Sequence, residues 1–84
     1  MNNPPRILIV DDEPFNVDYL EQELADFGYE LLTAANGEEA LEKIRTGAPD
    51  LVLLDIMMPI MDGFTVLEQA KADAAIRNIP IIII

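Results

Sequence analysis

Short, unbroken apolar runs alternate along this sequence with longer stretches in which apolar residues recur every three or four positions. The runs are predicted strands at residues 7–10, 30–35, 51–54 and 80–84, of which the second is the weakest. An apolar run without polar alternation is typical of a strand buried on both faces. Strands that alternate with helices pair in parallel through right-handed crossovers, with helices on both faces of the sheet. The pattern therefore predicts a βαβαβαβ domain of the α/β class.

The first helix is predicted from Pro14 onward, because proline suits the first position of a helix. Gly28 is expected to end this helix with a left-handed cap. Between these two residues, apolar side chains recur at three- and four-residue spacing, which places them on one face of the helix. The stripe expected to face the sheet consists of Val17, Leu20, Leu24 and Phe27.

Two further helices follow the second and third strands. The second starts at Asn36, whose side chain is expected to cap the helix while Glu39 reaches back in the manner of a capping box. Gly47 and Pro49 are expected to end it. The third helix is predicted from residue 65 to about residue 74.

The composition excludes several classes of function. Sixteen Asp and Glu residues against five Lys and Arg residues give a net charge of −11, which suits cations and basic partner surfaces. A field of this sign repels phosphate backbones and anionic lipid, so direct binding to nucleic acid or to a membrane surface is disfavoured. The sequence has no cysteine and no histidine, which excludes a thiolate zinc site and an imidazole base. No signal-peptide pattern is present and no apolar run approaches the ~20 residues of a membrane span, so a cytoplasmic location is expected.

Two of the predicted strands run directly into aspartate. Asp11 and Asp12 follow residues 7–10, and Asp55 follows residues 51–54. In open parallel sheets ligands bind outside the carboxyl ends of the strands, so neighbouring strands would bring these three carboxylates together. Like charges this close stay ionised only with a cation, and carboxylate oxygens favour Mg²⁺ or Mn²⁺ over zinc. An aspartate can also act as a nucleophile toward a phosphoryl group.

Each part of this pattern also has a plain structural explanation. Residues 11–13 suit an acidic helix start, which the helix dipole favours. Asp55 suits the start of a turn. Met57, Met58 and Met61 suit either an adaptable binding surface or ordinary packing. Because both aspartate positions lie at strand ends in one short domain, the metal site is favoured over the separate structural explanations.

Three segments resemble the receiver domain of two-component response regulators. They are residues 6–14 (RILIVDDEP), 35–41 (ANGEEAL) and 51–63 (LVLLDIMMPIMDG), in the order and spacing of that family. The resemblance runs from about residue 6 to residue 84. It implies a flavodoxin-like receiver fold, with a parallel sheet of strand order 2-1-3-4 and helices on both faces.

The resemblance implies a role for each site residue. Asp55 would accept a phosphoryl group from the phosphohistidine of a sensor histidine kinase or a phosphotransfer protein. Asp12 would bind Mg²⁺ directly, Asp11 would hold it mainly through water, and the backbone carbonyl of Met57 would be a further ligand. Asp55 belongs to the same ligand set, and Mn²⁺ is an alternative ion. The implied function is that of a phospho-accepting module of a two-component phosphorelay rather than that of an enzyme.

The resemblance covers the first part of the family's pattern. Receiver domains continue past the fourth strand to a Thr or Ser, a fourth helix, a fifth strand ending in Lys and a fifth helix, none of which lies in residues 1–84. We therefore expect a receiver domain over residues 1–84 that is incomplete at its C-terminal end, with a flexible tail at residues 1–5. The strand at residues 80–84 would then be an exposed apolar edge, expected to pair with another copy, to swap elements with it or to need a partner that completes the domain.

Two rival functions stay open on the sequence. An aspartyl-phosphate hydrolase also places aspartate after a buried strand with Mg²⁺, but those families resemble a strand followed by Asp-x-Asp, whereas Asp11 and Asp12 are adjacent and Glu13 follows. A truncated, non-switching receiver fragment would act through protein–protein contacts or self-association. Phosphorylation by a small phosphodonor separates the receiver from the fragment, and turnover of a generic phosphate ester would favour the hydrolase.

Overall fold

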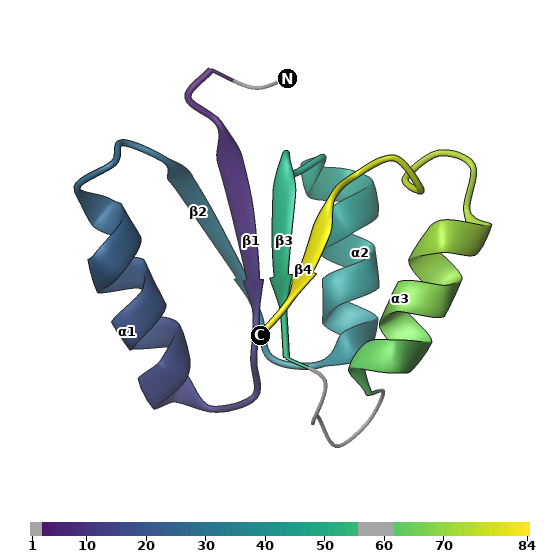
Figure 1. The fold of residues 1–84 in the computed structure, drawn as a ribbon, viewed down its shortest axis with the longest axis horizontal. Coiled ribbons are helices and arrows are strands. Elements are labelled where there is room, and N and C mark those ends of the chain that lie inside the picture. The colour runs from purple at the N-terminus through teal and green to yellow at the C-terminus, as the bar shows by residue number, and fades with distance from the viewer. Residues whose placement is uncertain (1–2, 56–61) are drawn as a thin grey trace.

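A computed structural model describes residues 3–55 and 62–84 of the chain. Within these ranges, strands and helices alternate along the sequence (Figure 1). The elements are β1 (Arg6–Val10), α1 (Pro14–Ala25), β2 (Glu30–Ala34), α2 (Gly37–Gly47), β3 (Leu51–Leu54), α3 (Gly63–Ala72) and β4 (Ile81–Ile83). Of the helices in the described ranges, none is both long enough and apolar enough to cross a membrane.

The described strands form one parallel sheet with the order β2-β1-β3-β4, which confirms the predicted topology. β1 lies in the interior of the sheet and pairs with β2 on one side and with β3 on the other. Val10 of β1 lies opposite Ala34 of β2 and Leu54 of β3, so these three strands end at the same level. The residues that follow β1 and β3, Asp11 and Asp55, therefore leave the sheet at the same edge.

The main hydrophobic core lies on the face of the sheet that α2 and α3 cover (Figure 1). Successive side chains of a strand point to opposite faces, so alternate strand residues contribute to this core. Its buried members are Leu8, Val10, Ala34, Ala40, Leu41, Ile44, Val52, Leu54, Val66, Ala70 and Ile76. Burial of apolar surface is the dominant favourable contribution to folding. The core on this face therefore stabilises the sheet whose strands are followed by the aspartates.

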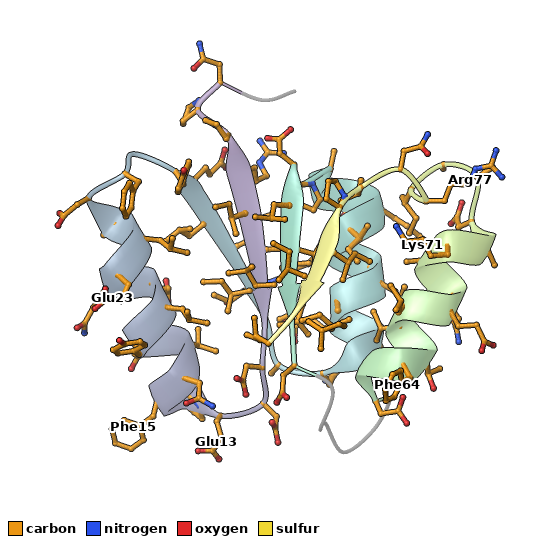
Figure 2. The ribbon with its side chains drawn as sticks, in the orientation of Figure 1. Glu13, Phe15, Glu23, Phe64, Lys71 and Arg77 are labelled. Carbon is orange, nitrogen blue, oxygen red and sulfur yellow. The ribbon has the colours of Figure 1, made fainter. Side chains whose placement is uncertain are left out.

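The other face of the sheet is covered by α1, and this packing is looser (Figure 1). The predicted stripe residues Val17, Leu20 and Leu24 are only partly buried, and no residue of α1 is fully buried. Phe15 points away from the sheet and is 85% exposed (Figure 2). The helix thus covers the sheet without forming a second tight core.

Phe27 does not belong to the stripe of α1, so this part of the prediction is wrong. The helix ends at Ala25, and the chain has left the helical path when it reaches Phe27. The Phe27 ring is 67% exposed and stacks on Tyr29, with the ring centroids 5.9 Å apart. Gly28 has the expected left-handed conformation, with a φ of 77°, but it lies in the turn beyond the helix cap.

α2 begins as predicted. The Asn36 side chain accepts a hydrogen bond from the Glu39 N–H at 2.9 Å. The Glu39 carboxylate reaches back to the Ala35 N–H at 3.3 Å, one residue before the position that a capping box uses. These two contacts fix the start of α2 directly after β2.

α2 ends at Gly47, which does not have a left-handed conformation. A Cβ atom at Gly47 would lie 2.9 Å from Leu32 Cδ1, so the Leu32 side chain would have to move. The left-handed residue is Ala48, with a φ of 45°. The predicted end of the helix at Gly47 and Pro49 is therefore correct in position, and the left-handed residue that follows the helix is Ala48.

α3 begins at Gly63, two residues earlier than predicted. The reason is a cap, since the Asp62 carboxylate accepts a hydrogen bond from the Thr65 N–H at 2.8 Å. Such a cap satisfies one of the backbone donors that the first turn of a helix leaves without a partner.

Asp73 connects the end of α3 to α2. Its carboxylate accepts the Ala75 N–H at 2.9 Å and lies 3.1 Å from Nε of Arg45. The hydrogen bond from Ala75, together with the Arg45 guanidinium, holds the pKa of the Asp73 carboxyl below its usual value of 3.8. A carboxyl with a lowered folded-state pKa contributes stability above its unfolded pKa and loses that contribution as the pH falls through the folded value. This connection is therefore complete at neutral pH and weakens only in acid.

β4 exposes apolar side chains. It extends over Ile81–Ile83, which is shorter than the predicted residues 80–84, and Ile82 and Ile83 are 50% and 39% exposed. Among the strands that the structure describes, β4 pairs with β3 alone.

The start of β1 is held by contacts with both neighbouring segments. The Arg6 N–H donates to Asp50 Oδ2 at 2.8 Å, and the Asp50 N–H donates back to the Arg6 carbonyl at 2.7 Å. The Arg6 guanidinium also pairs with the Glu30 carboxylate at 3.1 Å. Of the predicted tail, residues 3–5 are described, and the Pro5 carbonyl accepts the Glu30 N–H at 2.9 Å.

Asn36→Ala tests the cap of α2. We expect the free energy of unfolding to fall by about 1 kcal/mol, because the substitution removes the acceptor for the Glu39 N–H. Urea unfolding followed by circular dichroism measures the change. Asn78→Ala, at an exposed asparagine outside the helices, is the matched control and should unfold like the parent chain. Equal stability of Asn36→Ala and the parent would contradict the role of the cap.

Candidate metal and phosphoryl-acceptor site

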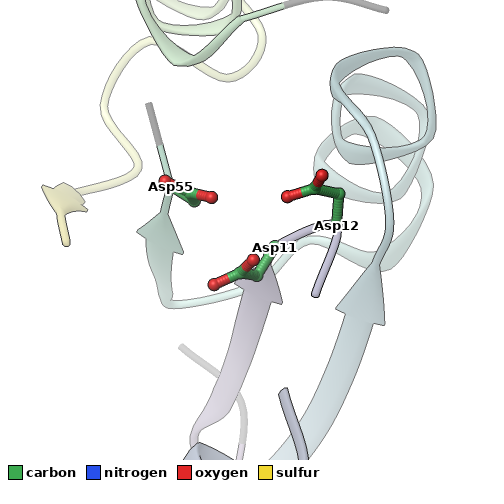
Figure 3. Close-up of side chains that lie close together, drawn as sticks. All are labelled: Asp11, Asp12 and Asp55. Atoms are coloured by element: carbon green, nitrogen blue, oxygen red, sulfur yellow. The ribbon is translucent and has the colours of Figure 1, made fainter. Parts of the chain in front are cut away.

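Three carboxylates meet at the edge of the sheet where β1 and β3 end (Figure 3). Asp11 and Asp12 follow β1, and Asp55 follows β3. One oxygen from each residue lies within 4.8 Å of an oxygen from each of the other two. We refer to these three residues as the aspartate cluster. The fold thus brings together aspartates from two segments that are far apart in the sequence.

Asp11 is the buried member of the aspartate cluster, with 5% of its surface exposed. Its Oδ1 accepts the Glu13 N–H at 3.0 Å, and its own N–H donates to the Ala34 carbonyl at 3.1 Å. Asp12 is exposed, and Asp55 is partly exposed. Asp11 is therefore fixed by the local backbone, whereas the other two carboxylates are accessible.

The aspartates do not form an acidic first turn of α1. The helix begins at Pro14 with Glu13 as its N-cap, and its first turn contains no acidic residue. Asp11 and Asp12 lie before the cap, so an acidic helix start does not account for them.

Among the described residues, two hollows border the aspartate cluster, and Asp11 lines both. The Asp55 hollow has a volume of about 340 Å³ and is lined by Asp11, Asn16, Tyr19, Leu20, Asp55 and Ile84. The Asp12 hollow has a volume of about 320 Å³ and is lined by Asp11, Asp12, Pro14, Val17, Asp18, Glu21, Thr33, Ala34, Ala35 and Glu39. Asp12 and Asp55 therefore open to different sides of the cluster.

The donor set fits a divalent cation bound through oxygen. Neither hollow is lined by a lysine or an arginine among the described residues. Carboxylates this close together repel one another, and a shared cation relieves the repulsion. An ion at 2.0–2.1 Å from each of two oxygens requires those oxygens to lie no more than about 4.2 Å apart. The oxygens of the aspartate cluster lie within 4.8 Å of one another, so a small side-chain shift or a bridging water would complete the coordination. Carboxylates completed by water suit Mg²⁺ or Mn²⁺.

Basic side chains of the described chain lie away from the cluster or are already engaged. Figure 2 shows Arg77 at the end of the molecule opposite to Glu13, which follows the cluster in the sequence. Lys43 pairs with Glu39 at 3.2 Å and donates to the Thr33 carbonyl. Carboxylates therefore make the electrostatic field at the Asp12 hollow negative.

The sequence prediction of a ligand at Met57 cannot be placed, because residues 56–61 lie outside the described residues. The same holds for Met58 and Met61, for which the sequence suits either a binding surface or ordinary packing. These positions stay predictions.

The Asp55 hollow contains two polar side chains that reasoning from the sequence missed. Asn16 and Tyr19 come from the first turns of α1 and share the hollow with Asp55. The available signal was the short connection between β1 and α1, which is residues 11–13. A connection this short places the start of α1 at the same edge of the sheet as the aspartates.

Solved receiver domains have the same fold as this chain. The N-terminal domain of a response regulator receiver protein from Methanoculleus marisnigri JR1 matches with a TM-score of 0.90 and 50% sequence identity, over 93% of this chain and 63% of that chain. The receiver domain of the sensor histidine kinase PA1611 from Pseudomonas aeruginosa PAO1 matches with a TM-score of 0.89 and 30% identity, over 94% of this chain and 64% of that chain. That receiver domain has a magnesium ion coordinated in its active site cleft. The expected flavodoxin-like receiver fold is confirmed.

Sequence comparison gives the same family. Response regulator PleD from Caulobacter vibrioides (strain NA1000 / CB15N) is 48% identical over 79 residues, which cover 94% of this chain and 17% of PleD. The chain therefore spans a small part of the length of this relative. A family model described as the response regulator receiver domain matches residues 7–84. The chain belongs to the family of response regulator receiver domains.

Proposed function

We propose that the chain is the phospho-accepting receiver module of a two-component phosphorelay, in which a partner histidine kinase phosphorylates Asp55. The observation that carries this proposal is the convergence of Asp11, Asp12 and Asp55 at one edge of the sheet, with oxygens within 4.8 Å of one another. Asp55 also lines a hollow through which a phosphoryl donor would reach its carboxylate. Membership of the receiver family supports the same function.

In the proposed site, Asp12 binds Mg²⁺ directly and Asp11 binds it mainly through water. The Glu13 N–H already occupies one oxygen of Asp11, which supports its smaller direct role. Asp55 supplies the third carboxylate, and the backbone carbonyl of Met57, outside the described residues, is proposed as a further ligand. When bound, Mg²⁺ or Mn²⁺ supplies the positive charge that lets a phosphoryl group approach several carboxylates. The receiver domain of PA1611 has a magnesium ion coordinated in its active site cleft, which supports Mg²⁺ as the ion.

The proposed phosphoryl transfer uses the Asp55 carboxylate as the nucleophile. One carboxylate oxygen attacks the phosphorus of a phosphohistidine, the new P–O bond forms, the P–N bond breaks and the imidazole leaves with the electron pair. The product is an aspartyl phosphate on this chain. The chain thus receives the phosphoryl group itself, which distinguishes it from an enzyme that hydrolyses an external phosphate ester.

The proposed partners are a sensor histidine kinase or a phosphotransfer protein. The net charge of −11 and the acidic lining of the Asp12 hollow favour a partner surface with basic side chains around the histidine. The same charge disfavours direct contact of this domain with nucleic acid or with an anionic membrane surface.

Asp55→Asn tests the identity of the acceptor. Incubated with Mg²⁺ and acetyl phosphate, the parent chain should gain one phosphoryl group by intact mass, whereas Asp55→Asn should gain none because it lacks the nucleophilic carboxylate. Asp26→Asn, at the exposed aspartate that follows α1, is the matched control and should be labelled like the parent. Labelling of Asp55→Asn at the level of the parent would show that the acceptor lies elsewhere.

Magnesium should stabilise the folded chain, because the aspartate cluster is assembled only on folding. We expect several millimolar Mg²⁺ to raise Tm by a few degrees relative to sodium chloride of equal ionic strength, since ~1 kcal/mol shifts Tm of a domain of this size by roughly 4–8 °C. Asp12→Asn should reduce this shift, and Asp26→Asn should retain it. A parent chain whose Tm does not respond to Mg²⁺ would argue against the metal site.

A second candidate function, protein–protein contact through β4, is favoured by the exposure of Ile82 and Ile83. Exposed apolar strand edges are templates for pairing with another chain. We propose that the 84-residue chain pairs with a second copy along this strand.

Light scattering at tens of micromolar tests this self-association and should show a dimer or a larger species. Ile82→Lys should shift the chain toward the monomer, because a charge on the edge strand opposes pairing. Phe64→Lys, at a 63% exposed position on α3, is the control and should leave the association unchanged. A parent chain that is monomeric at this concentration would contradict the pairing.

A further inference from the structure

Side chains of α1 share the Asp55 hollow with the proposed acceptor. Asn16, Tyr19 and Leu20 come from α1, while Asp11 and Asp55 come from the strand ends. The volume of about 340 Å³ corresponds to on the order of ten water molecules, at ~30 Å³ each. The hollow is therefore large enough for a phosphoryl group on Asp55 together with an attacking water.

Two hydrogen bonds hold the backbone of Asn16 in place relative to the cluster. The Glu13 N–H donates to Asp11 Oδ1 at 3.0 Å, and the Asn16 N–H donates to the Glu13 carbonyl at 3.1 Å. The Asn16 side chain makes no hydrogen bond to any residue that the structure describes. Asparagine is also a poorer helix former than alanine, so helix propensity does not account for it in the first turn of α1. The exposed Asn16 amide thus lines the hollow beside Asp55, with both its donor and its acceptor available.

An amide in this position suits the hydrolysis of an aspartyl phosphate. A water oxygen attacks the phosphorus, the bond between phosphorus and the Asp55 oxygen breaks, and the carboxylate leaves with the electron pair. The proton of the water passes to the inorganic phosphate that forms. Asn16 Oδ1 can accept a hydrogen bond from this water, and its Nδ2 can donate to a phosphoryl oxygen. Of the other groups that line the hollow, Leu20 of α1 and Ile84, which follows β4, are apolar, and Tyr19 lies one turn further along α1.

We propose that Asn16 is a positioning residue that orients the water attacking a phosphoryl group on Asp55, and that it thereby shortens the lifetime of the aspartyl phosphate. The inference rests on the proposed phosphorylation of Asp55. It assigns Asn16 a contact with the attacking water rather than with Mg²⁺, for which Asp11, Asp12, Asp55 and the backbone carbonyl of Met57 are the proposed ligands.

The test follows the decay of the aspartyl phosphate after acetyl phosphate is removed, with the Mg²⁺ concentration held constant. Asn16→Ala should lengthen the lifetime about threefold to tenfold, the effect expected for one hydrogen bond in the transition state. Asn16→Gln keeps the amide and should decay at a rate closer to that of the parent. Asn78→Ala, at an exposed asparagine outside the hollow, is the matched control and should decay like the parent. The Mg²⁺-dependent shift in Tm should be the same in all four proteins, as a positioning role requires.

An unchanged or shorter lifetime in Asn16→Ala overturns the inference, as does equally slow decay in Asn16→Gln or in Asn78→Ala. A parent chain that takes up no phosphoryl group overturns the proposed function, and the inference with it. Phosphorylation of the parent without any effect of Asn16→Ala overturns the inference alone, so the two failures are distinguishable.

Discussion

The parallel pairing of β1 with β3 is the interaction on which the site depends. Val10 lies opposite Leu54, and the pairing continues with a hydrogen bond from the Asp55 N–H to the Val10 carbonyl at 2.9 Å. Because this register ends both strands at the same level, it sets the carboxylates of residues 11, 12 and 55 side by side. A slip of one residue would turn every side chain of the strand to the other face, so burial of the core also fixes the position of the acceptor.

The two faces of the sheet contribute differently to stability and to access. On the face covered by α2 and α3, Ile44, Leu54 and Val66 are almost completely buried. On the other face, α1 is only partly buried, and its first turns line the hollow that contains Asp55. We infer that the tight face holds the strand register, while the looser packing of α1 leaves room beside the carboxylate for a phosphoryl donor and for water.

Signals that act over a few residues made most of the fold predictable, such as the apolar runs of the strands and the cap at Asn36. The end of α1 was less predictable, because apolar spacing continues to Phe27 while the helix stops at Ala25. Strand order was predicted from the family resemblance, because the pairing of strands that lie far apart in the chain produces no local sequence pattern. The aspartates were predictable because each follows an apolar run. Asn16 was not, because its place in the hollow depends on how α1 packs over the strand ends.

Anomalous diffraction from crystals of the chain grown with Mn²⁺ is the most direct test of a shared ion in the aspartate cluster. We expect one Mn²⁺ ion at roughly 2 Å from a carboxylate oxygen of Asp12 and from one of Asp55, with Asp11 contacting it mainly through water. Anomalous density elsewhere on the molecule, with none between Asp12 and Asp55, would contradict the assignment of these carboxylates to a single metal site.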